Sequence, residues 1–418
     1  MKKTLIILWI IILAGMIFII DYYFKPEALE KNPSEEIIDE TPIIDDLPIA
    51  DLLPSEKKET ATQAKERLLK EQKENPKDLN TNLELIKTYI ALKDIPAAQG
   101  LINSLDTQQP KIKYYQAILK ILYKDFDGAQ ILFSEIIEET TDKNSQKFID
   151  KYGLFSTFKE SDPLYLQTLL AKTLTEVKEY YAAIPLLFDI INEQPNYRDA
   201  WIILGYAYLQ TNKIADAIDS LSSAESLDTE KPETLFLLGL AYFANNNTER
   251  AIYYIEKADK NGFEPKDQIN LKLGELYLLK GKYEKAAKKF ETVLDLNTSS
   301  IDVFVRAVFL NIDHLKNPEK ALELAKLAAE NHPKNPMTYN LLGWAYTEVS
   351  EFDKALENLE KAIEMDPDFD AAHLNFGNFY EKQNLDTLAK EYYKKAYLLG
   401  QGNDIARKAA QKYKALTP

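Results

Sequence analysis

The chain of 418 residues contains no cysteine, only three histidines and only 13 glycines. Without cysteine there is no disulfide, no thiolate metal site and no cysteine nucleophile. His314, His332 and His373 lack the spacing to one another or to carboxylates that metal ligands show. The sequence also lacks a glycine-rich phosphate loop and a nucleophile elbow. We therefore expect no catalytic residue, no metal and no cofactor, and we predict that the chain is not an enzyme.

The charge of the chain is unevenly distributed. Acidic residues outnumber basic ones by 66 to 51, so the formal net charge is −15. A nucleic-acid binder needs clustered lysine and arginine, so nucleic acid is not an expected partner. Residues 26–54 contain five prolines, no glycine and nine acids against one base. We predict that residues 25–60 form an extended, acidic, proline-rich linker. Its apolar motifs, such as residues 43–51, leave open a second interpretation, in which the linker docks on a partner or in a groove of this chain.

Residues 4–20 are uncharged and rich in leucine and isoleucine. As a helix they would be about 25 Å long, slightly shorter than the ~30 Å hydrocarbon core of a bilayer. Lys2 and Lys3 precede them, aromatic residues follow, and no site for signal cleavage is evident. We predict that residues 1–24 are an uncleaved signal anchor that crosses the lipid bilayer through residues 4–20. Basic residues before the span and acids after it place the N-terminus in the cytoplasm and the rest outside the cell membrane.

A repeat of 34 or 35 residues extends through most of the remaining chain. One position in it is occupied by glycine or alanine with one exception, as in Ala171, Gly205, Gly239, Gly274, Phe309, Gly343 and Gly377. Tyrosine usually follows this small-residue position after three residues, and alanine follows it after 12 residues in all seven repeats. Apolar residues recur between these positions at helical spacing. Each repeat is therefore predicted to be a pair of helices whose backbones approach closely at the small residue.

These positions resemble the tetratricopeptide repeat family. Residues 201–205 with Tyr208, Ala217, Leu221 and Ala224 fit its signature nearly in full. The resemblance implies an all-α fold, a right-handed superhelical solenoid of helix-turn-helix repeats. It also implies that the first helix of each repeat lines a concave groove in which partner proteins bind.

The same resemblance divides the chain after the linker into four parts. We predict tetratricopeptide-like repeats over residues 61–138 and seven full repeats over residues 164–402. Residues 139–163 do not fit the pattern and are predicted to be an insertion, a helix and a loop at a weak joint of the array. Residues 403–418 are predicted to form the capping helix that such arrays require.

The groove-lining positions of the first helices are the candidate partner-binding site. They are Ile202, Tyr206, Leu209, Phe236, Leu240, Phe243, Leu271, Glu275, Leu278, Arg306, Asp313, Asn340, Trp344 and Asn378. The predicted groove is apolar in its middle and polar, with mixed charge, at its C-terminal end. Such a groove suits a peptide or a helical segment of a partner, with Phe236, Phe243 and Trp344 as aromatic anchors. The alternative is that these residues are buried against neighbouring repeats.

The resemblance and the anchor together predict a membrane-anchored scaffold for protein–protein interaction in the assembly of an extracytoplasmic envelope complex. Two alternatives stay open. The apolar middle of the groove could serve a holdase-type chaperone for exported or unfolded chains. The array could also be a regulatory subunit of an envelope enzyme, or carry an active site in Thr140–Pro163.

Overall fold

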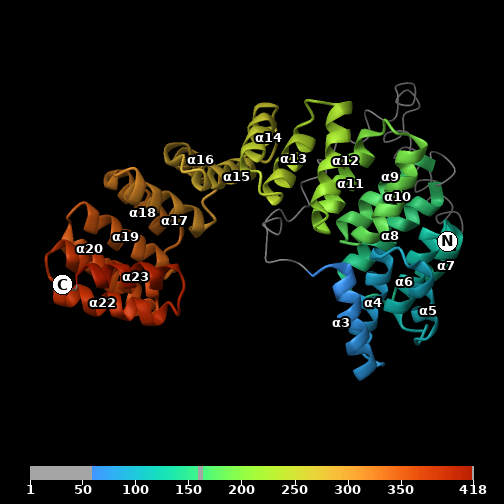
Figure 1. The fold of residues 1–418 in the computed structure, drawn as a ribbon, viewed down its shortest axis with the longest axis horizontal. Helices are drawn as coiled ribbons and strands as arrows, with labels where there is room; N and C mark the ends of the chain where they lie inside the picture. The colour runs from blue at the N-terminus through green and yellow to red at the C-terminus, as the bar shows by residue number, and fades with distance from the viewer. Residues whose placement is uncertain (1–58, 159–162, 417–418) are drawn as a thin grey trace, which may run out of the picture. The chain divides into compact units, whose positions relative to one another are not determined.

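The computed structural model describes residues 59–158 and 163–416 (Figure 1). All regular secondary structure in these two ranges is helical. The predicted anchor and almost all of the predicted linker lie outside the described residues. Among the helices that are described, none is long and apolar enough to cross a membrane.

The chain divides into two compact units, residues 1–250 and residues 251–418. The described helices that lie wholly in unit 1 are α3 (Ala61–Glu74), α4 (Leu79–Ala91), α5 (Ile95–Asn103), α6 (Pro110–Leu122), α7 (Phe126–Ile136), α8 (Lys143–Phe158), α9 (Pro163–Glu176), α10 (Tyr180–Glu193), α11 (Arg198–Gln210), α12 (Ile214–Leu227) and α13 (Pro232–Ala244). Helix α14 (Thr248–Lys260) contains the boundary. Those wholly in unit 2 are α15 (Lys266–Leu279), α16 (Tyr283–Leu296), α17 (Ile301–Phe309), η3 (Leu310–His314), α18 (Pro318–Asn331), α19 (Pro336–Glu348), α20 (Phe352–Met365), α21 (Asp370–Lys382), α22 (Asp386–Leu399) and α23 (Asp404–Ala415).

The helix pairs form where the sequence predicts them, because the small residues let the two helices of a repeat touch. A Cβ atom on Gly343 would lie 2.5 Å from Cγ of Leu359, which is on the second helix of the same repeat. A Cβ atom on Gly377 would lie 2.3 Å from the ring of Tyr393. A side chain at either position would therefore force the helices apart.

A residue in the left-handed conformation marks the turn between the two helices of a repeat. Positive φ is found at Lys93, Lys124, Lys178, Asn212, Asn246, Gly281, Lys316, Ser350 and Asn384. In all but one of these turns, the N–H of the next residue donates to the carbonyl five residues before it. An example is the 2.9 Å bond from Lys213 N–H to Tyr208 O. The left-handed residue reverses the chain and starts the second helix.

The repeat formed by α17, η3 and α18 is the exception. The N–H of Asn317 donates to Asn311 O at 2.8 Å, one residue earlier than the pattern requires, and η3 is a π-helix. The first helix thus contains one additional residue. Phe309 is only half-buried, whereas Val308 is fully buried. The prediction that Phe309 takes the small-residue position is therefore wrong, and Val308 takes it.

Residues 143–158, predicted as part of an insertion, form the additional helix α8, which contacts α7 and α9. Its rings of Phe148 and Tyr152 lie 5.7 and 4.9 Å from the ring of Phe133 on α7. The described part of residues 139–163 lies inside unit 1, and the boundary between the two units follows Arg250. The aromatic residues of α8 that break the repeat pattern pack against α7 and build a core there.

Candidate functional site

The apolar middle of the predicted groove is buried inside unit 1. Ile202 and Phe236 are fully inaccessible, and Tyr206, Leu209 and Leu240 expose 8% or less. The first helices α9, α11 and α13 contact one another in sequence and cover these side chains. The five residues therefore serve as packing residues in this structure. Phe243, at the end of α13, is half-buried.

The predicted groove residues on α15 and α17 form a charged pair flanked by half-buried leucines. Arg306 donates to Glu275 at 3.1 Å, and Lys272 donates to the other oxygen of the same carboxylate at 2.8 Å. The half-buried neighbours on α15 are Leu271 and Leu278. Glu275 thus joins two consecutive first helices of unit 2.

The C-terminal end of the predicted groove contains a cavity of about 490 Å³. Three of its lining residues are predicted ones, namely Asp313 on η3, Trp344 on α19 and Asn378 on α21. The other lining residues are Glu348, Glu381, Lys382, Asn384, Lys408 and Lys412. The cavity therefore collects side chains from η3, α19, α21 and α23, and all of these elements belong to unit 2.

Three ion pairs line this cavity. Lys408 on α23 contacts Asp313 at 2.8 Å although the two residues are 95 positions apart in the chain. Lys412, one helical turn further along α23, contacts Glu381 at 3.0 Å. Lys382 and Glu348 form the third pair, at 2.6 Å. All six side chains remain partly exposed to solvent, so each pair contributes little to stability and is free to exchange partners.

Below the ion pairs, amide side chains connect α19 to α21. Asn375 donates to the buried Asn340 at 2.9 Å, and Asn378 donates to Asn375 at 3.1 Å. The hydroxyl of Tyr393 bonds Asn378 at 2.9 Å and also bonds Glu381. Burial and the bond to Glu381 raise the pKa of Tyr393, which therefore stays a neutral donor. This network fixes Asn378 and Glu381, whereas Asn340 is too deeply buried to contact a partner.

Of the fourteen predicted residues, Asp313, Trp344 and Asn378 thus lie together at the cavity of unit 2. Sequence reasoning missed the lysines of α23 and the Glu348–Lys382 pair. One signal was available for the lysines, because Lys408 and Lys412 are four residues apart on the predicted capping helix and must share a face.

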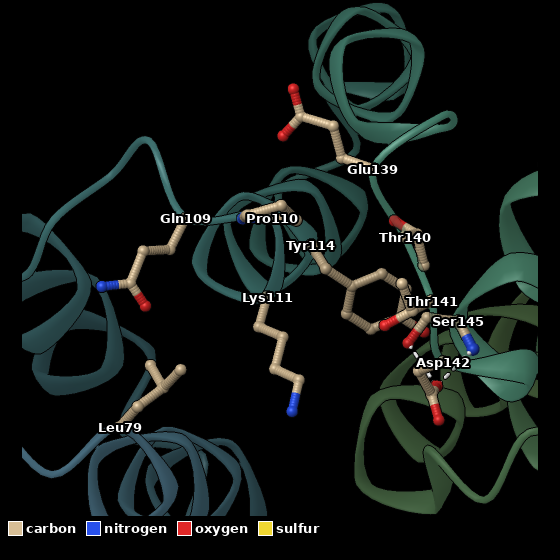
Figure 2. Close-up of a pocket in the computed structure, with 10 residues that line it drawn as sticks. All are labelled: Leu79, Gln109, Pro110, Lys111, Tyr114, Glu139, Thr140, Thr141, Asp142 and Ser145. Carbon is tan, nitrogen blue, oxygen red and sulfur yellow. Dashed lines mark hydrogen bonds between the residues drawn. The ribbon is translucent and has the colours of Figure 1, made fainter.

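Unit 1 contains a second polar concavity, which the sequence did not indicate. A cavity of about 480 Å³ is lined by residues that include Lys87, Lys111, Tyr114, Tyr115 and Glu179. The adjoining pocket of about 260 Å³ is drawn in Figure 2, where the ring of Tyr114 lies beside Asp142 and Ser145 at the start of α8 and Lys111 lines another part of the pocket. There Asp142 accepts bonds from the N–H and hydroxyl of Ser145, at 2.7 and 2.8 Å. These bonds lower the pKa of Asp142, which stays ionised.

Glu179 is the unusual acid of this second cavity. Burial raises the pKa of its carboxyl group, even though the hydroxyl of Tyr115 donates to it at 2.6 Å. Burial also raises the pKa of Tyr115. A carboxyl group and a phenol that both resist ionisation indicate a structural contact between α6 and the turn before α10.

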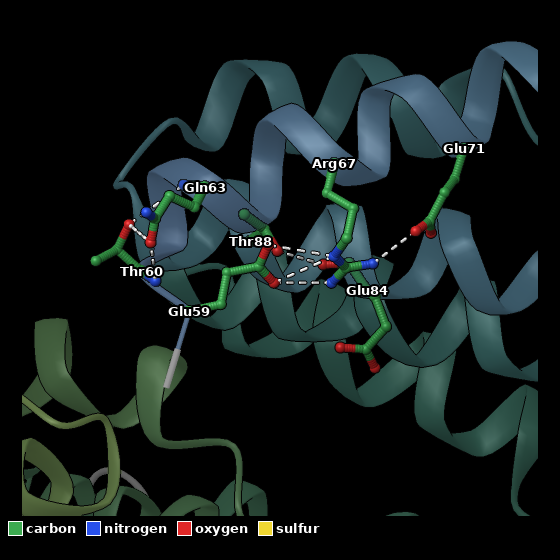
Figure 3. A network of polar contacts seen from close by, with 7 residues as sticks. All are labelled: Glu59, Thr60, Gln63, Arg67, Glu71, Glu84 and Thr88. Atoms are coloured by element: carbon green, nitrogen blue, oxygen red, sulfur yellow. Dashed lines mark hydrogen bonds and ion pairs between the residues drawn. The ribbon is translucent and has the colours of Figure 1, made fainter. Parts of the chain in front are cut away.

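Arg67 on α3 belongs to a third polar network, drawn in Figure 3. Its guanidinium lies between Glu71 at 2.9 Å and Glu59 at 3.0 Å, and Thr60 and Gln63 form the capping box that starts α3. These contacts lie at the start of α3, and Figure 3 draws with them Glu84 and Thr88 of the neighbouring helix α4. We interpret them as the start of the helical array rather than as a binding site.

Among the described residues, no group of three or more acidic or histidine side chains could hold a metal ion. The histidines of unit 2 make packing contacts instead. His373, for example, is buried and lies 2.9 Å from Pro367 O through Nε2.

Comparison with known proteins identifies the repeats. Family models described as "Tetratricopeptide repeat" match residues 236–301 and residues 336–369, and a model described as "TPR repeat" matches residues 205–246. These segments are tetratricopeptide repeats. They lie within the helical array of the described residues, in agreement with the all-α repeat fold expected from the resemblance.

Two relatives are similar over more than half of this chain. Anaphase-promoting complex subunit CDC16 of Saccharomyces cerevisiae is 23% identical over 314 residues, 71% of this chain and 36% of that protein. The peroxisomal targeting signal receptor of Candida albicans is 23% identical over 258 residues, 56% of this chain and 39% of that protein. This chain thus spans well under half the length of either relative.

A solved structure, the Cut9–Hcn1 hetero-tetramer of the anaphase-promoting complex, aligns with 86% of this chain and 87% of that chain. Its TM-score is 0.37 and its sequence identity 15%.

Proposed function

We propose that this protein is an interaction scaffold that holds a segment of a partner protein in the cavity of unit 2. One observation carries the proposal. Trp344 is half-buried at a cavity of about 490 Å³, among charged and amide side chains from four separate elements. A large aromatic surface surrounded by polar groups is the composition of a binding hot spot. The names of the two relatives, a complex subunit and a receptor, support a binding role.

The holdase alternative is not favoured, because it depends on an apolar groove. Its central residues, including Ile202 and Phe236, are buried. Nor do we propose a catalytic role for Thr140–Pro163. Phe148 and Tyr152 of this segment are buried as packing residues of α8.

The proposal includes a membrane location. The uncharged residues 4–20, preceded by Lys2 and Lys3, support an N-terminal anchor, and the acidic residues after them support an array outside the cytoplasm. In this location the scaffold would serve the assembly of an envelope complex.

A photo-crosslinking experiment tests the binding site. The residue Trp344 is replaced by benzoyl-phenylalanine in the full chain, and the same replacement at Leu398, which is 62% exposed on α22, serves as the control. We expect a discrete crosslinked protein from position 344 and none of the same identity from position 398. The crosslinked segment, made as a peptide, should then bind the purified chain, and Trp344→Ala should weaken this binding by about 30-fold or more.

Two results would contradict the proposed site. One is an identical crosslinking pattern from both positions. The other is equal affinity of the peptide for wild type and for Trp344→Ala, with an unchanged far-ultraviolet circular dichroism spectrum of the variant.

The membrane location has a separate test. Because the chain contains no cysteine, a single cysteine introduced at Lys2 or at Pro418 can be labelled without background. A membrane-impermeant maleimide added to intact cells should label the variant at 418 and not the variant at 2. Labelling of both, or of the variant at 2 alone, would contradict the proposed topology.

A further inference from the structure

We propose that the cavity of unit 2 binds a helical segment carrying two lysines or arginines one turn apart, and that Lys408 and Lys412 occupy the same two positions in the unbound chain. This inference rests on the proposed function and specifies the chemistry of the partner. It follows from how the two lysines are held.

The first position is built for a cation. The ammonium group of Lys408 lies 2.8 Å from the carboxylate of Asp313. It also lies 5.8 Å from the ring centre of Trp344 and 5.9 Å from that of Phe309. A carboxylate together with two aromatic rings within about 6 Å is an arrangement that attracts lysine or arginine. The π-helix η3 contributes to it, because its additional residue moves Phe309 out of the helix interface, while η3 itself carries Asp313.

The second position lies one helical turn away along α23. Lys412 contacts Glu381 at 3.0 Å, and Glu381 also accepts a bond from the hydroxyl of Tyr393. Tyr393 is fully buried, so it holds the carboxylate in place whether or not the lysine is present. Two carboxylates, of which Glu381 is held by Tyr393, are thus matched to two cations at positions i and i+4 of one helix.

The balance of charge favours a basic segment over an acidic one. Without Lys408 and Lys412, the charged residues that line the cavity are Asp313, Glu348, Glu381 and Lys382. Three carboxylates and one ammonium group leave an excess of negative charge. An acidic peptide would be repelled, whereas a basic one would restore neutrality.

Exchange of the lysines does not require α23 to unfold. The side chains of Lys408 and Lys412 are 40% and 37% exposed, so they can rotate into solvent. Ala406 and Ala409 meanwhile keep α23 attached, since both are fully buried. The partner would therefore replace two ammonium groups and gain contact with Trp344, while the two lysines of the chain compete with it.

The test uses the full chain and a fluorescein-labelled, alanine-based helical peptide with lysine at positions i and i+4. A peptide of the same design with glutamate at these positions is the reference. Fluorescence anisotropy should show that the lysine peptide binds and that the glutamate peptide does not. The double variant Lys408→Ala/Lys412→Ala should bind the lysine peptide about two- to thirty-fold more tightly than wild type, since two competing ion pairs are removed.

Two further variants make the result specific. Asp313→Asn/Glu381→Gln should lose binding, and Glu381→Gln keeps an oxygen that can accept from Tyr393. Lys395→Ala removes an exposed lysine from α22, paired with Glu391 at 3.0 Å and absent from the cavity lining, and should leave the affinity unchanged. The inference is overturned if Lys408→Ala/Lys412→Ala binds no more tightly than wild type, or if the two peptides bind equally.

The two proposals can fail separately. If the lysine peptide does not compete with a partner segment that depends on Trp344, the cavity is a binding site for a different chemistry and only this inference is wrong. If Trp344→Ala has no effect on the partner segment, the proposed function itself is wrong.

Discussion

Residues 110–158 of unit 1 and the regular repeats of unit 2 bury their helices in different ways. In α6, α7 and α8 the space between helices is filled by aromatic rings, with Phe133 in contact with Tyr114, Phe148 and Tyr152. In unit 2 the helices of a pair touch at a glycine, as at Gly343, and a single large side chain such as Leu359 covers it.

The difference shows what a regular repeat makes possible. In the repeat that Gly343 closes, the first helix α19 carries Trp344 at the cavity of unit 2. Where aromatic packing replaces the regular contact, the concave face acquires buried polar contacts such as Tyr115–Glu179. Residues 110–158 of unit 1 therefore mainly pack against one another, whereas the repeat of Gly343 in unit 2 presents a surface.

The largest loss of folding stability is expected from a substitution in the aromatic core of α6, α7 and α8. Phe133→Ala should lower the free energy of unfolding by about 3–5 kcal/mol, because it leaves a cavity among rings that cannot collapse into it. Urea unfolding followed by circular dichroism measures this loss. Tyr123→Ala, in the same unit with a ring that is 56% exposed, is the control and should change stability by less than about 1 kcal/mol. Equal effects of the two substitutions would show that the rings do not form a cohesive core.

A smaller effect with a defined sign is expected at the glycine contact. Gly343→Ala should destabilise the chain by about 1–3 kcal/mol, because its Cβ would overlap Leu359. Gly100→Ala, on α5 of unit 1, should instead stabilise by about 0.5–1 kcal/mol, since a Cβ there meets nothing within 4 Å.

The double variant Gly343→Ala/Leu359→Ala checks the mechanism. The double variant should lose less stability than the sum of the losses of the two single variants. The reason is that the shorter side chain at 359 removes the overlap with the Cβ atom at 343. Additive effects would mean that the glycine matters for another reason.

The smallest effect is a pH dependence confined to unit 1. Burial raises the pKa of Glu179 above its ordinary value of 4.5, so the folded chain binds the proton more tightly than the unfolded chain. The stability that this group contributes is fully present below about pH 4.5 and is lost as pH rises through the raised pKa. Glu179→Gln should therefore remove a decline in the stability of unit 1 with rising pH, measured by hydrogen exchange at α6 and α10.

A second variant sharpens this prediction. Tyr115→Phe removes the hydroxyl that stabilises the ionised carboxylate. It should raise the pKa of Glu179 further and move the decline to higher pH. Superimposable pH profiles of wild type, Glu179→Gln and Tyr115→Phe would show that the carboxyl group does not titrate in this range.

The repeat fold could be predicted from the sequence because few residues determine it. At positions 205, 343 and 377 a glycine is needed because the second helix of the repeat approaches too closely for a side chain. The regular spacing of these glycines can therefore be recognised in the sequence alone. The small-residue position was wrongly assigned to Phe309 because a π-helix shifts the register by one residue. This shift depends on backbone hydrogen bonds, which the side chains in the sequence do not indicate.

The candidate site was predictable only in part. Trp344 and Asp313 were found because they lie on the concave side of successive first helices. Phe236 has the same kind of position but is buried, since exposure depends on how closely neighbouring first helices contact one another. The pairing of Lys408 with Asp313 joins residues 95 positions apart, and only the curvature of the array within unit 2 brings them together.

The left-handed turn residues give the array a stability that can be adjusted one repeat at a time. Lys93, Lys124, Lys178 and Lys316 hold a conformation that costs a residue with a Cβ about 1–2 kcal/mol, and Gly281 holds it freely. Among Lys316, Ser350 and Asn384, the turn residues that follow the cavity-lining first helices, only Asn384 lines the cavity of unit 2. Glycine at the other turns would strengthen individual repeats and leave the binding surface as it is. The stability of the repeats and the binding surface can therefore be changed by separate substitutions.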